Sequence, residues 1–226
     1  MKHSGKPGRD TRKRILDAAE YLFSHNGFHR TSIKQLASEA KVNLAAINYH
    51  FGSKMALIEK VIERQLRPIN QQRVERLAAI RQTAARKGCR PLAEDLLHAF
   101  IEPAFTINTQ MQERRYLLAL AGRAFSETDT AIRTIFINQF KPPFMLLFQA
   151  MREALPDLPE DVLLWRLHFA IGAMTHCMRL CSVDSPSADL CPQADDSETQ
   201  VKMLMEFVTR GICTPYQPVE KRSKRR

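Results

Sequence analysis

The chain has 226 residues, of which 44% are hydrophobic, enough to bury a core in one large domain or in a small domain plus a larger one. Its 34 Lys and Arg residues outnumber 24 Asp and Glu, and the formal net charge of +10 favours a polyanionic partner, either nucleic acid or an anionic membrane surface. The low count of 8 glycines favours an all-α fold, and the lack of a signal or bilayer-spanning segment favours a soluble cytoplasmic protein.

The first helix is expected over residues 10–26. Before it, residues 1–9 are basic and contain glycine and proline, which is typical of a flexible arm. Within residues 10–26, apolar residues recur at helical spacing, from Ile15 to Phe23. The pair Asn26 and Gly27 then provides a stop signal, because glycine readily takes the left-handed conformation that ends a helix.

Two short helices with a tight turn between them are expected over residues 31–51. Ser32 and Gln35 have the spacing of a capping box at the start of the first, and Asn43 is a favourable N-cap for the second. A short helix, a tight turn and a second short helix predict a helix-turn-helix, a DNA-binding motif. Small or apolar side chains are required where the two helices meet, and Ala37, Val42, Ile47 and Phe51 meet this requirement.

The second helix of this motif has an outward face suited to DNA. Small side chains at Ala45 and Ala46 let a helix enter the major groove, and Asn48 can pair bidentately with adenine. The alternative is an ordinary solvated helix face. The residues expected to contact bases or phosphates are Ser32, Lys34, Asn43, Leu44, Ala45, Ala46, Asn48, Tyr49, His50 and Lys54. From the arm and first helix, Arg9 and Arg12 are expected to contact phosphates or the minor groove, with solvated charge as the alternative.

Further helices follow from Lys54 onward. We expect a kink or break at Pro68, because proline removes a backbone donor, and bending or splitting at Pro103 and at the pair Pro142 and Pro143. The expected helices lie at 70–86, 91–108, 111–125, 127–154, 159–182 and 198–212. The expected domains are the head at 10–54, a larger helical domain at 55–213 and a basic tail at 214–226.

The run GFHRTSIKQLASEAKVNLAAINYHFGSKMALIEKV resembles the DNA-binding domain of the TetR/AcrR family of bacterial regulators. The G-F-x-x-T-S link at residues 27–32 and the Y-H-F-G-S-K run at residues 49–54 carry this resemblance. It implies a three-helix head joined to a larger bundle that binds a ligand and dimerises. It further implies a homodimer on a palindromic double-stranded operator in the bacterial nucleoid, acting as a repressor or, less commonly, an activator.

Two residues depart from the family pattern. Lys41 stands at a turn position that is usually glycine, so we expect some left-handed backbone strain there. Asn48 stands where the family often has tyrosine, which suggests a different operator sequence.

The second domain is expected to bind a small hydrophobic effector. The stretches LLALAGRAFSE, FMLLFQAMREALPDLP and LLWRLHFAIGAMTHCM are similar to fatty-acid-responsive regulators of the PsrA type, which implies a fatty acid or acyl-CoA. An unrelated hydrophobic compound or drug is the alternative, and each aromatic residue can equally belong to the core. The expected pocket residues are Phe100, Phe105, Tyr116, Arg123, Phe144, Phe148, Trp165, His168 and Phe169.

The last two long helices are apolar almost all round, so they must be covered on more than one side. A two-fold four-helix interface provides this cover, and ordinary packing within one chain is the alternative. The expected interface residues are Leu164, Ile171, Met174, Met178, Val201, Leu204, Met205 and Val208.

Other functional classes lack support in the sequence. No catalytic motif appears in a convincing context, so we expect neither an enzyme nor a cofactor. His168, His176, Cys177 and Cys181 lack the paired spacing of a zinc site, and the five cysteines are expected to be reduced thiols, with redox sensing as an alternative. A basic lipid-binding protein of the membrane surface remains a remote alternative, but the basic residues cluster around the helix-turn-helix instead of forming one long amphipathic helix.

Overall fold

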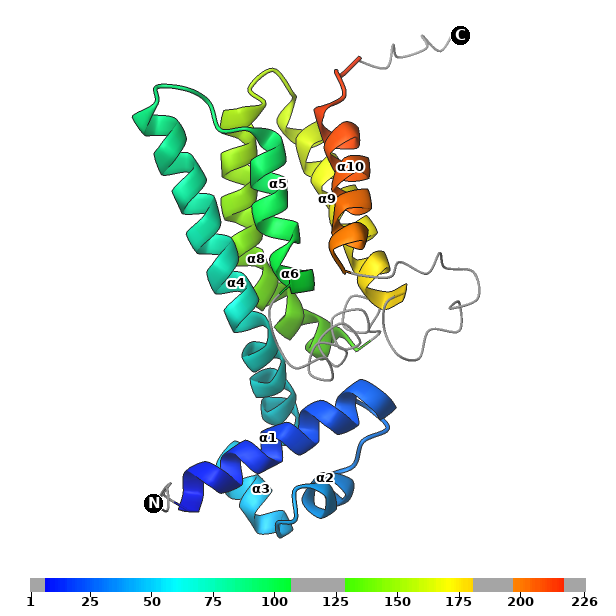
Figure 1. Ribbon diagram of the computed structural model, residues 1–226. Coiled ribbons are helices and arrows are strands. Elements are labelled where there is room, and N and C mark those ends of the chain that lie inside the picture. Colours follow the sequence, from blue (N-terminus) through cyan, green and yellow to red (C-terminus); the bar gives the residue numbers. More distant parts are fainter. Residues whose placement is uncertain (1–6, 107–128, 181–196, 218–226) are drawn as a thin grey trace, which may run out of the picture.

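The computed structural model describes residues 7–106, 129–180 and 197–217, and every regular element in these ranges is an α-helix. Figure 1 shows a small N-terminal head of three helices and a taller helical bundle, joined by the long helix α4 (Lys54–Arg86). The predicted all-α fold, with a small head and a larger bundle, is therefore confirmed.

The head consists of α1 (Pro7–Asn26), α2 (Ile33–Glu39) and α3 (Leu44–Phe51). Helix α1 begins three residues before the expected start, so Arg9 belongs to a helix and not to a flexible arm. It ends as predicted, because Gly27 takes a φ of 84°. The head core consists of buried apolar side chains from all three helices and the first turns of α4 (Ile15, Ala19, Phe23, Phe28, Leu36, Ile47, Leu57 and Val61).

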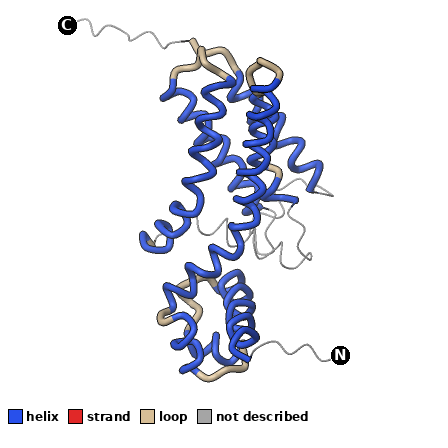
Figure 2. Tube along the Cα trace, turned by 90° about the vertical axis from the view of Figure 1, so that its left-hand side faces the viewer, coloured by secondary structure: helices blue, strands red, loops and turns tan. Residues whose placement is uncertain are grey.

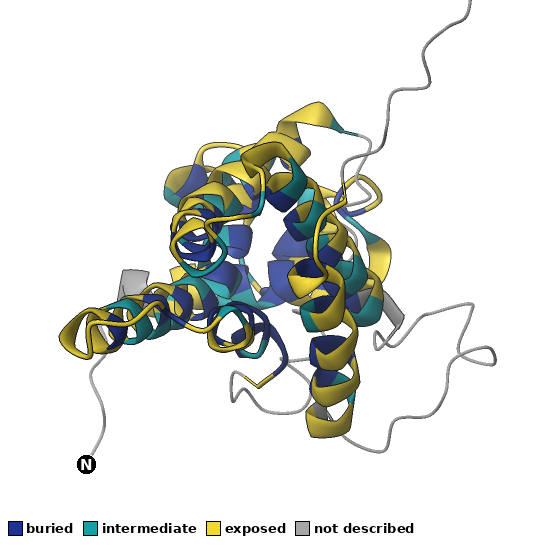
Figure 3. Ribbon diagram, turned by 90° about the horizontal axis from the view of Figure 1, so that it is seen from above, coloured by how far each residue is buried: buried dark blue, intermediate teal, exposed yellow. Residues whose placement is uncertain are grey.

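The bundle consists of α4, α5 (Ala93–Ile101), α6 (Pro103–Thr106), α8 (Thr130–Ala154), α9 (Glu160–Leu180) and α10 (Ser197–Cys213). Helix α4 packs along α8 and α5, while α9 packs against α10 and α8. Figure 2, turned by 90°, shows α4 running from the head into the bundle. His29 of the head also lies 3.6 Å from the carboxylate of Asp129, the N-cap of α8. Seen from above in Figure 3, the buried faces of the bundle helices turn toward one another.

Proline has different effects at its three predicted break points. Pro103 separates α5 from α6, as expected. Of the kink or break expected at Pro68, the break is wrong: the 33-residue helix α4 continues through it, although Pro68 has no N–H to bond the carbonyl of Arg64. Helix α8 likewise continues through Pro142 and Pro143. The helix expected at 111–125 lies outside the described residues.

Within the described parts of the chain, no helix is both long and apolar enough to cross a membrane.

Candidate nucleic-acid interface and ligand cavity

The two short helices of the head carry the predicted caps. At α2, the Ser32 hydroxyl accepts a hydrogen bond from the N–H of Gln35, and the Gln35 side chain accepts one from the N–H of Ser32. At α3, the Asn43 side chain accepts a hydrogen bond from the N–H of Ala46 at 2.8 Å. These bonds satisfy N–H groups that a helix start otherwise leaves unpaired, so both helix starts are locally determined.

Helix α3 has one buried face and one exposed face. Ile47 and Phe51 are buried and pack with Ala37 of α2, while Val42 is half-buried beside them. The opposite face bears Tyr49, which is 86% exposed. Of the other expected DNA contacts, Ser32, Lys34, Asn43, Leu44, Ala45 and Asn48 are exposed, and Ala46, His50 and Lys54 are half-buried.

The link between α1 and α2 explains why the G-F-x-x-T-S run is needed. Phe28 is buried with its ring centroid 5.4 Å from that of Phe23. Thr31 is buried too, and its hydroxyl lies 2.9 Å from the carbonyl oxygen of Gly27 and 3.2 Å from that of Leu22. These contacts fix the end of α1 against the start of α2.

The turn between α2 and α3 is held by a residue from α1. Lys41 has a φ of 53°, the left-handed conformation expected for a position that usually carries glycine. The Arg14 guanidinium donates to the carbonyl oxygens of Ala40 and Lys41, both at 2.6 Å. Sequence reasoning missed this role of Arg14, because its partners are backbone groups far along the chain.

Two cationic side chains lie near the C-terminal end of α3. Arg12 is exposed, and its guanidinium carbon lies 5.3 Å from the centre of the Phe51 ring. Lys54 is half-buried, with Nζ 3.4 Å from the carbonyl oxygen of His29, and burial lowers the pKa of its ammonium group. The side chain of Arg9, the other expected arm contact, lies outside the described part.

An ion cluster joins the head to α4. Arg64 of α4 lies 2.7 Å from the Asp17 carboxylate and 3.3 Å from that of the buried Glu20, both on α1. Partial burial would raise the pKa of Asp17, but hydrogen bonds from Lys13 and Arg64 outweigh it and lower the pKa below 3.8. Because the folded-state pKa lies below the unfolded value, this contact contributes fully above pH 3.8 and is lost as pH falls through the lowered pKa.

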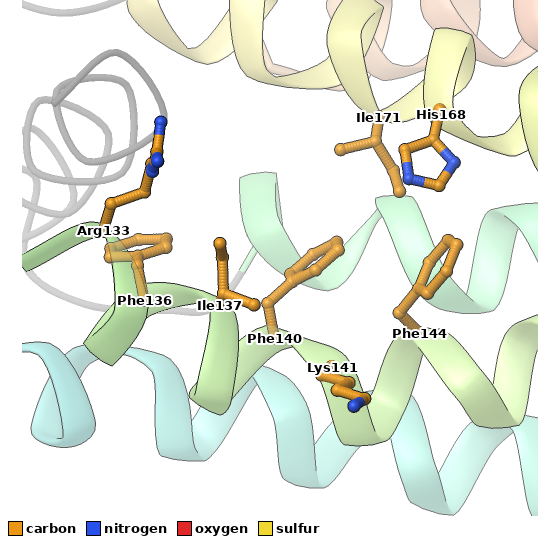
Figure 4. A pocket seen from close by; sticks show the side chains of 8 residues that line it. All are labelled: Arg133, Phe136, Ile137, Phe140, Lys141, Phe144, His168 and Ile171. Atoms are coloured by element: carbon orange, nitrogen blue, oxygen red, sulfur yellow. The ribbon is translucent and has the colours of Figure 1, made fainter. Parts of the chain in front are cut away.

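A cavity of about 330 Å³ lies between α8 and α9. Figure 4 shows Phe140 and Phe144 of α8 pointing toward Ile171 and His168 of α9, whereas Lys141 points away. The volume lies at the lower end of the ~300–1,000 Å³ range of ligand pockets. Its lining is mainly apolar, with three basic residues and no carboxylate among the described lining residues (Arg133, Phe136, Ile137, Phe140, Lys141, Phe144, His168 and Ile171).

The expected pocket residues are distributed over three environments. Phe144 and His168 line the cavity, with ring centroids 5.5 Å apart. Phe100, Phe105 and Phe148 are buried in the core and do not line it, while Trp165 and Phe169 are exposed and stack on each other. Tyr116 and Arg123 lie outside the described residues.

Sequence reasoning missed most of the cavity wall. Phe136, Phe140 and Phe144 recur every four residues, so the spacing places them on one face of α8. This four-residue spacing is the sequence feature that could have identified the cavity wall. Ile171, expected at a dimer interface, lines the cavity instead.

The remaining expected interface residues are mostly buried within one chain. Six of them pack α9 and α10 into the bundle, which revises the expected interface (Met174, Met178, Val201, Leu204, Met205 and Val208). Leu164 is exposed, as an interface residue requires. Large apolar side chains that were not expected there share this exposure: Trp165 at 65%, Phe169 at 67%, Met203 at 51% and Phe207 at 70%.

One buried charge lies in the bundle core. Arg73 of α4 is only 2% exposed, and its guanidinium donates to the carbonyl oxygen of Phe100 at 2.7 Å and to the Asn70 side chain at 3.2 Å. Arg166, by contrast, donates to the carbonyls of Ile212 and Thr214 at the end of α10. Within the described ranges, no three His, Cys, Asp or Glu side chains are grouped as metal ligands.

Two family models match the chain. The model described as "Bacterial regulatory proteins, tetR family" matches residues 15–61, and the model described as "Tetracyclin repressor-like, C-terminal domain" matches residues 98–211. A curated relative, the HTH-type transcriptional regulator UidR of Escherichia coli K12, is 44% identical over 52 residues. Those residues are 23% of this chain and 26% of UidR, so the chain matches about a quarter of that relative's length.

Two solved structures share the architecture. FadR from Bacillus subtilis, in complex with stearoyl-CoA, has a TM-score of 0.66 and 14% identity, covering 88% of this chain and 98% of FadR. A transcriptional regulator from Saccharomonospora viridis, in complex with choline, has a TM-score of 0.59 and 16% identity, covering 89% and 96%. At such identities the likeness establishes the fold, and these two neighbours bind chemically different ligands.

Proposed function

Because the chain belongs to the TetR family of bacterial transcriptional regulators, we propose that it binds an operator as a homodimer and that a fatty acid or acyl-CoA modulates this binding. Members of the family are DNA-binding regulators and not enzymes. The effector part of the proposal rests on one observation, the apolar cavity between α8 and α9.

The proposed DNA contacts lie on the exposed face of α3. This helix is short and carries Ala45 and Ala46 near its start, so it can enter a major groove about 12 Å wide. Asn48, which is exposed on this face, is proposed to read a base, and the neighbouring Tyr49 is 86% exposed. Lys54 and Arg12, near the C-terminal end of α3, are proposed to contact phosphates, which set the position of the helix rather than its sequence preference.

The proposed dimer forms through the outward faces of α9 and α10. Trp165, Phe169 and Phe207 are each more than half exposed, although such large apolar side chains are usually covered. A second copy of the chain, related by two-fold symmetry, covers them. Helix-turn-helix proteins bind two half-sites about 34–36 Å apart or at multiples of that distance, so the dimer also gives the operator its palindromic form.

Charge favours an acyl effector over a cation. The cavity combines aromatic walls with Arg133 and His168, and no acidic residue is found among its described lining. A cation such as the choline bound by one structural neighbour is therefore disfavoured, whereas an apolar chain with a negative end, as in the stearoyl-CoA bound by FadR, is favoured. A different hydrophobic compound with a negative group is the alternative.

The proposed regulation acts through α4. Helix α8, which forms one wall of the cavity, packs along α4, and α4 continues into the head, where Arg64 bonds α1. Effector binding changes the spacing of the two heads of a dimer by moving α4. The effector shifts this equilibrium only by its different affinity for the two arrangements. We propose repression as the default outcome, with activation as the alternative.

Selection of bound DNA from a random pool tests the proposal. The full chain is incubated with random duplexes alone, with decanoate and with decanoyl-CoA, and the recovered sequences are compared. We expect an enriched palindrome whose recovery changes at least several-fold when one acyl compound is present. Failure to enrich a palindrome would contradict the dimeric operator model. An enriched palindrome that neither acyl compound affects would leave DNA binding intact and remove the acyl effector.

A further inference from the structure

Arg73 lies where four helices of the bundle meet. It belongs to α4, and its partners are the Phe100 carbonyl oxygen of α5, the Asn70 side chain of α4 and the Met174 sulfur of α9 at 3.9 Å. Its guanidinium carbon also lies 4.2 Å from the ring centre of Phe100 and 5.6 Å from that of Phe140 on α8. All of these partners are electrically neutral.

A buried guanidinium with neutral partners is costly. Burial lowers the pKa of Arg73 to about 9, so the group still carries its charge at pH 7. Buried charges are ordinarily paired with an opposite charge, because removal from water is strongly unfavourable. Among the residues that the structure describes, no carboxylate forms an ion pair with Arg73. The site therefore has unused capacity for an anion.

This guanidinium lies directly behind the wall of the ligand cavity. Phe140 lines the cavity on one side and faces Arg73 on the other. Ile171 lines the cavity too, and Met174, which contacts Arg73, lies three residues further along the same face of α9. The ring of Phe140 and the flexible side chain of Met174 separate the cavity from the charge, and methionine readily changes its conformation.

We propose that Arg73 binds the free carboxylate of an acyl effector that enters the cavity with its charged end first. This proposal rests on the proposed function and deepens it, because it selects a free fatty acid over its coenzyme A thioester. A planar guanidinium forms two parallel hydrogen bonds with a carboxylate. The thioester has no carboxylate at the end of its acyl chain, so it cannot form this pair.

The position of Arg73 links the effector to DNA binding. Nine residues, about 13–14 Å of helix at 1.5 Å per residue, separate it from Arg64, which bonds the head. A carboxylate on Arg73 therefore acts on the helix that carries the head, with no intervening element.

Calorimetric titration of the full chain with three ten-carbon probes tests the proposal. Decanoate, methyl decanoate and decanoyl-CoA share one chain and differ at its end. Charge-assisted hydrogen bonds predict that the wild-type chain binds decanoate about 10- to 100-fold more tightly than the methyl ester. In R73M this preference is expected to disappear, with affinity for the ester nearly unchanged. R67M, which removes an exposed positive charge of the same helix away from the cavity lining, is the matched control and should retain the preference.

Several outcomes separate this proposal from the proposed function. Tighter binding of decanoyl-CoA than decanoate would overturn the role of Arg73 and leave the acyl effector intact. Equal preference for decanoate in R73M and the wild-type chain would do the same. Binding of none of the three probes would contradict both. Circular dichroism checks that R73M is folded, and if it is not, the comparison of acid with ester on the wild-type chain still decides the proposal.

Discussion

Lys41 and Arg14 show how one strained residue is maintained in the head. A non-glycine residue in the left-handed conformation costs about 1–2 kcal/mol. Lys41 adopts this conformation at the turn of the helix-turn-helix. Arg14 donates hydrogen bonds to the backbone carbonyl of Lys41 and to that of the preceding residue, Ala40. The long-range contact thus stabilises a turn whose local sequence is unfavourable.

Replacing Lys41 tests this balance. K41G removes the Cβ strain and keeps the backbone carbonyl that Arg14 binds, so we expect the head to be more stable than in K41A by about 1 kcal/mol. Urea unfolding followed by circular dichroism measures the difference. K41A is the matched control, since it removes the same charge and keeps the Cβ. Equal stability of the two variants would show that the turn is not strained.

Asn48 and Lys54 are predicted to play different parts on the same surface. N48A should relax the preference at one base pair of each half-site, at a cost of about 1–3 kcal/mol for the preferred base. K54A should weaken binding to all sequences alike and reduce the salt dependence by about one phosphate contact. Binding measured against single-base operator variants at several salt concentrations distinguishes the two. An unaltered base profile in N48A would rule out its reading role.

At the scale of an element, α4 is the connection on which regulation depends. It passes unbroken through Pro68, and buried side chains anchor it on both sides of that proline: Val61, Ile62 and Leu66 before it, Ile69 and Leu77 after it. This packing outweighs the cost of a proline inside a helix, about 3 kcal/mol for the missing hydrogen bond and the clash of the proline ring together. A continuous helix transmits a displacement of its bundle half to its head half.

Removing Arg64 is expected to uncouple the head from α4. R64A eliminates the contacts with Asp17 and Glu20, so operator binding should persist while its response to the effector falls several-fold. R67A is a close control, because Arg67 is exposed and, among the described residues, forms its ion pair with Glu63 of its own helix. Operator titrations with and without effector compare the variants. An effector response in R64A equal to that in R67A would exclude this contact from the pathway.

At the scale of the whole molecule, exposed aromatic residues on α9 and α10 support a two-fold assembly. Trp165 and Phe169 stack on the surface of α9, and Phe207 lies exposed on α10. A glutamate at positions 165 and 207 places charges in the proposed interface. We expect the double variant W165E/F207E to sediment as a monomer at micromolar concentration, while the wild-type chain sediments as a dimer.

Operator affinity should fall with the loss of the dimer, by a factor of about 100 or more, because the second half-site no longer binds intramolecularly. V74E is the control, since Val74 is a partly exposed apolar residue of α4 away from α9 and α10. If W165E/F207E remains a dimer, the dimer interface does not include Trp165 and Phe207.

Short-range patterns were sufficient to predict the head. The strain at Lys41 was expected from the family resemblance, because the family usually has glycine there. The capping box of Ser32 and Gln35 and the N-cap at Asn43 involve residues within a few positions of one another. Their interactions follow from helix geometry alone, so the helix-turn-helix and its buried face could be read from the sequence. The clamp from Arg14 could not, because its partners are 26 and 27 residues away.

In the bundle, by contrast, short-range patterns were not sufficient to predict which residues are buried. Periodicity identified α9 and α10 as apolar all round, but Met174 is buried and Phe207 is exposed, and only the neighbouring helices decide which face is covered. The cavity is formed by residues of α8 and α9 together. The charge of Arg73 is enclosed by four helices, although in the sequence Arg73 is one of several basic residues in a largely polar helix. The sequence by itself determined the all-α fold and the DNA-binding motif, because local hydrogen bonds and helical spacing specify them. The tertiary structure decided the cavity, the outward face and the buried charge, because burial depends on contacts between segments far apart in the chain.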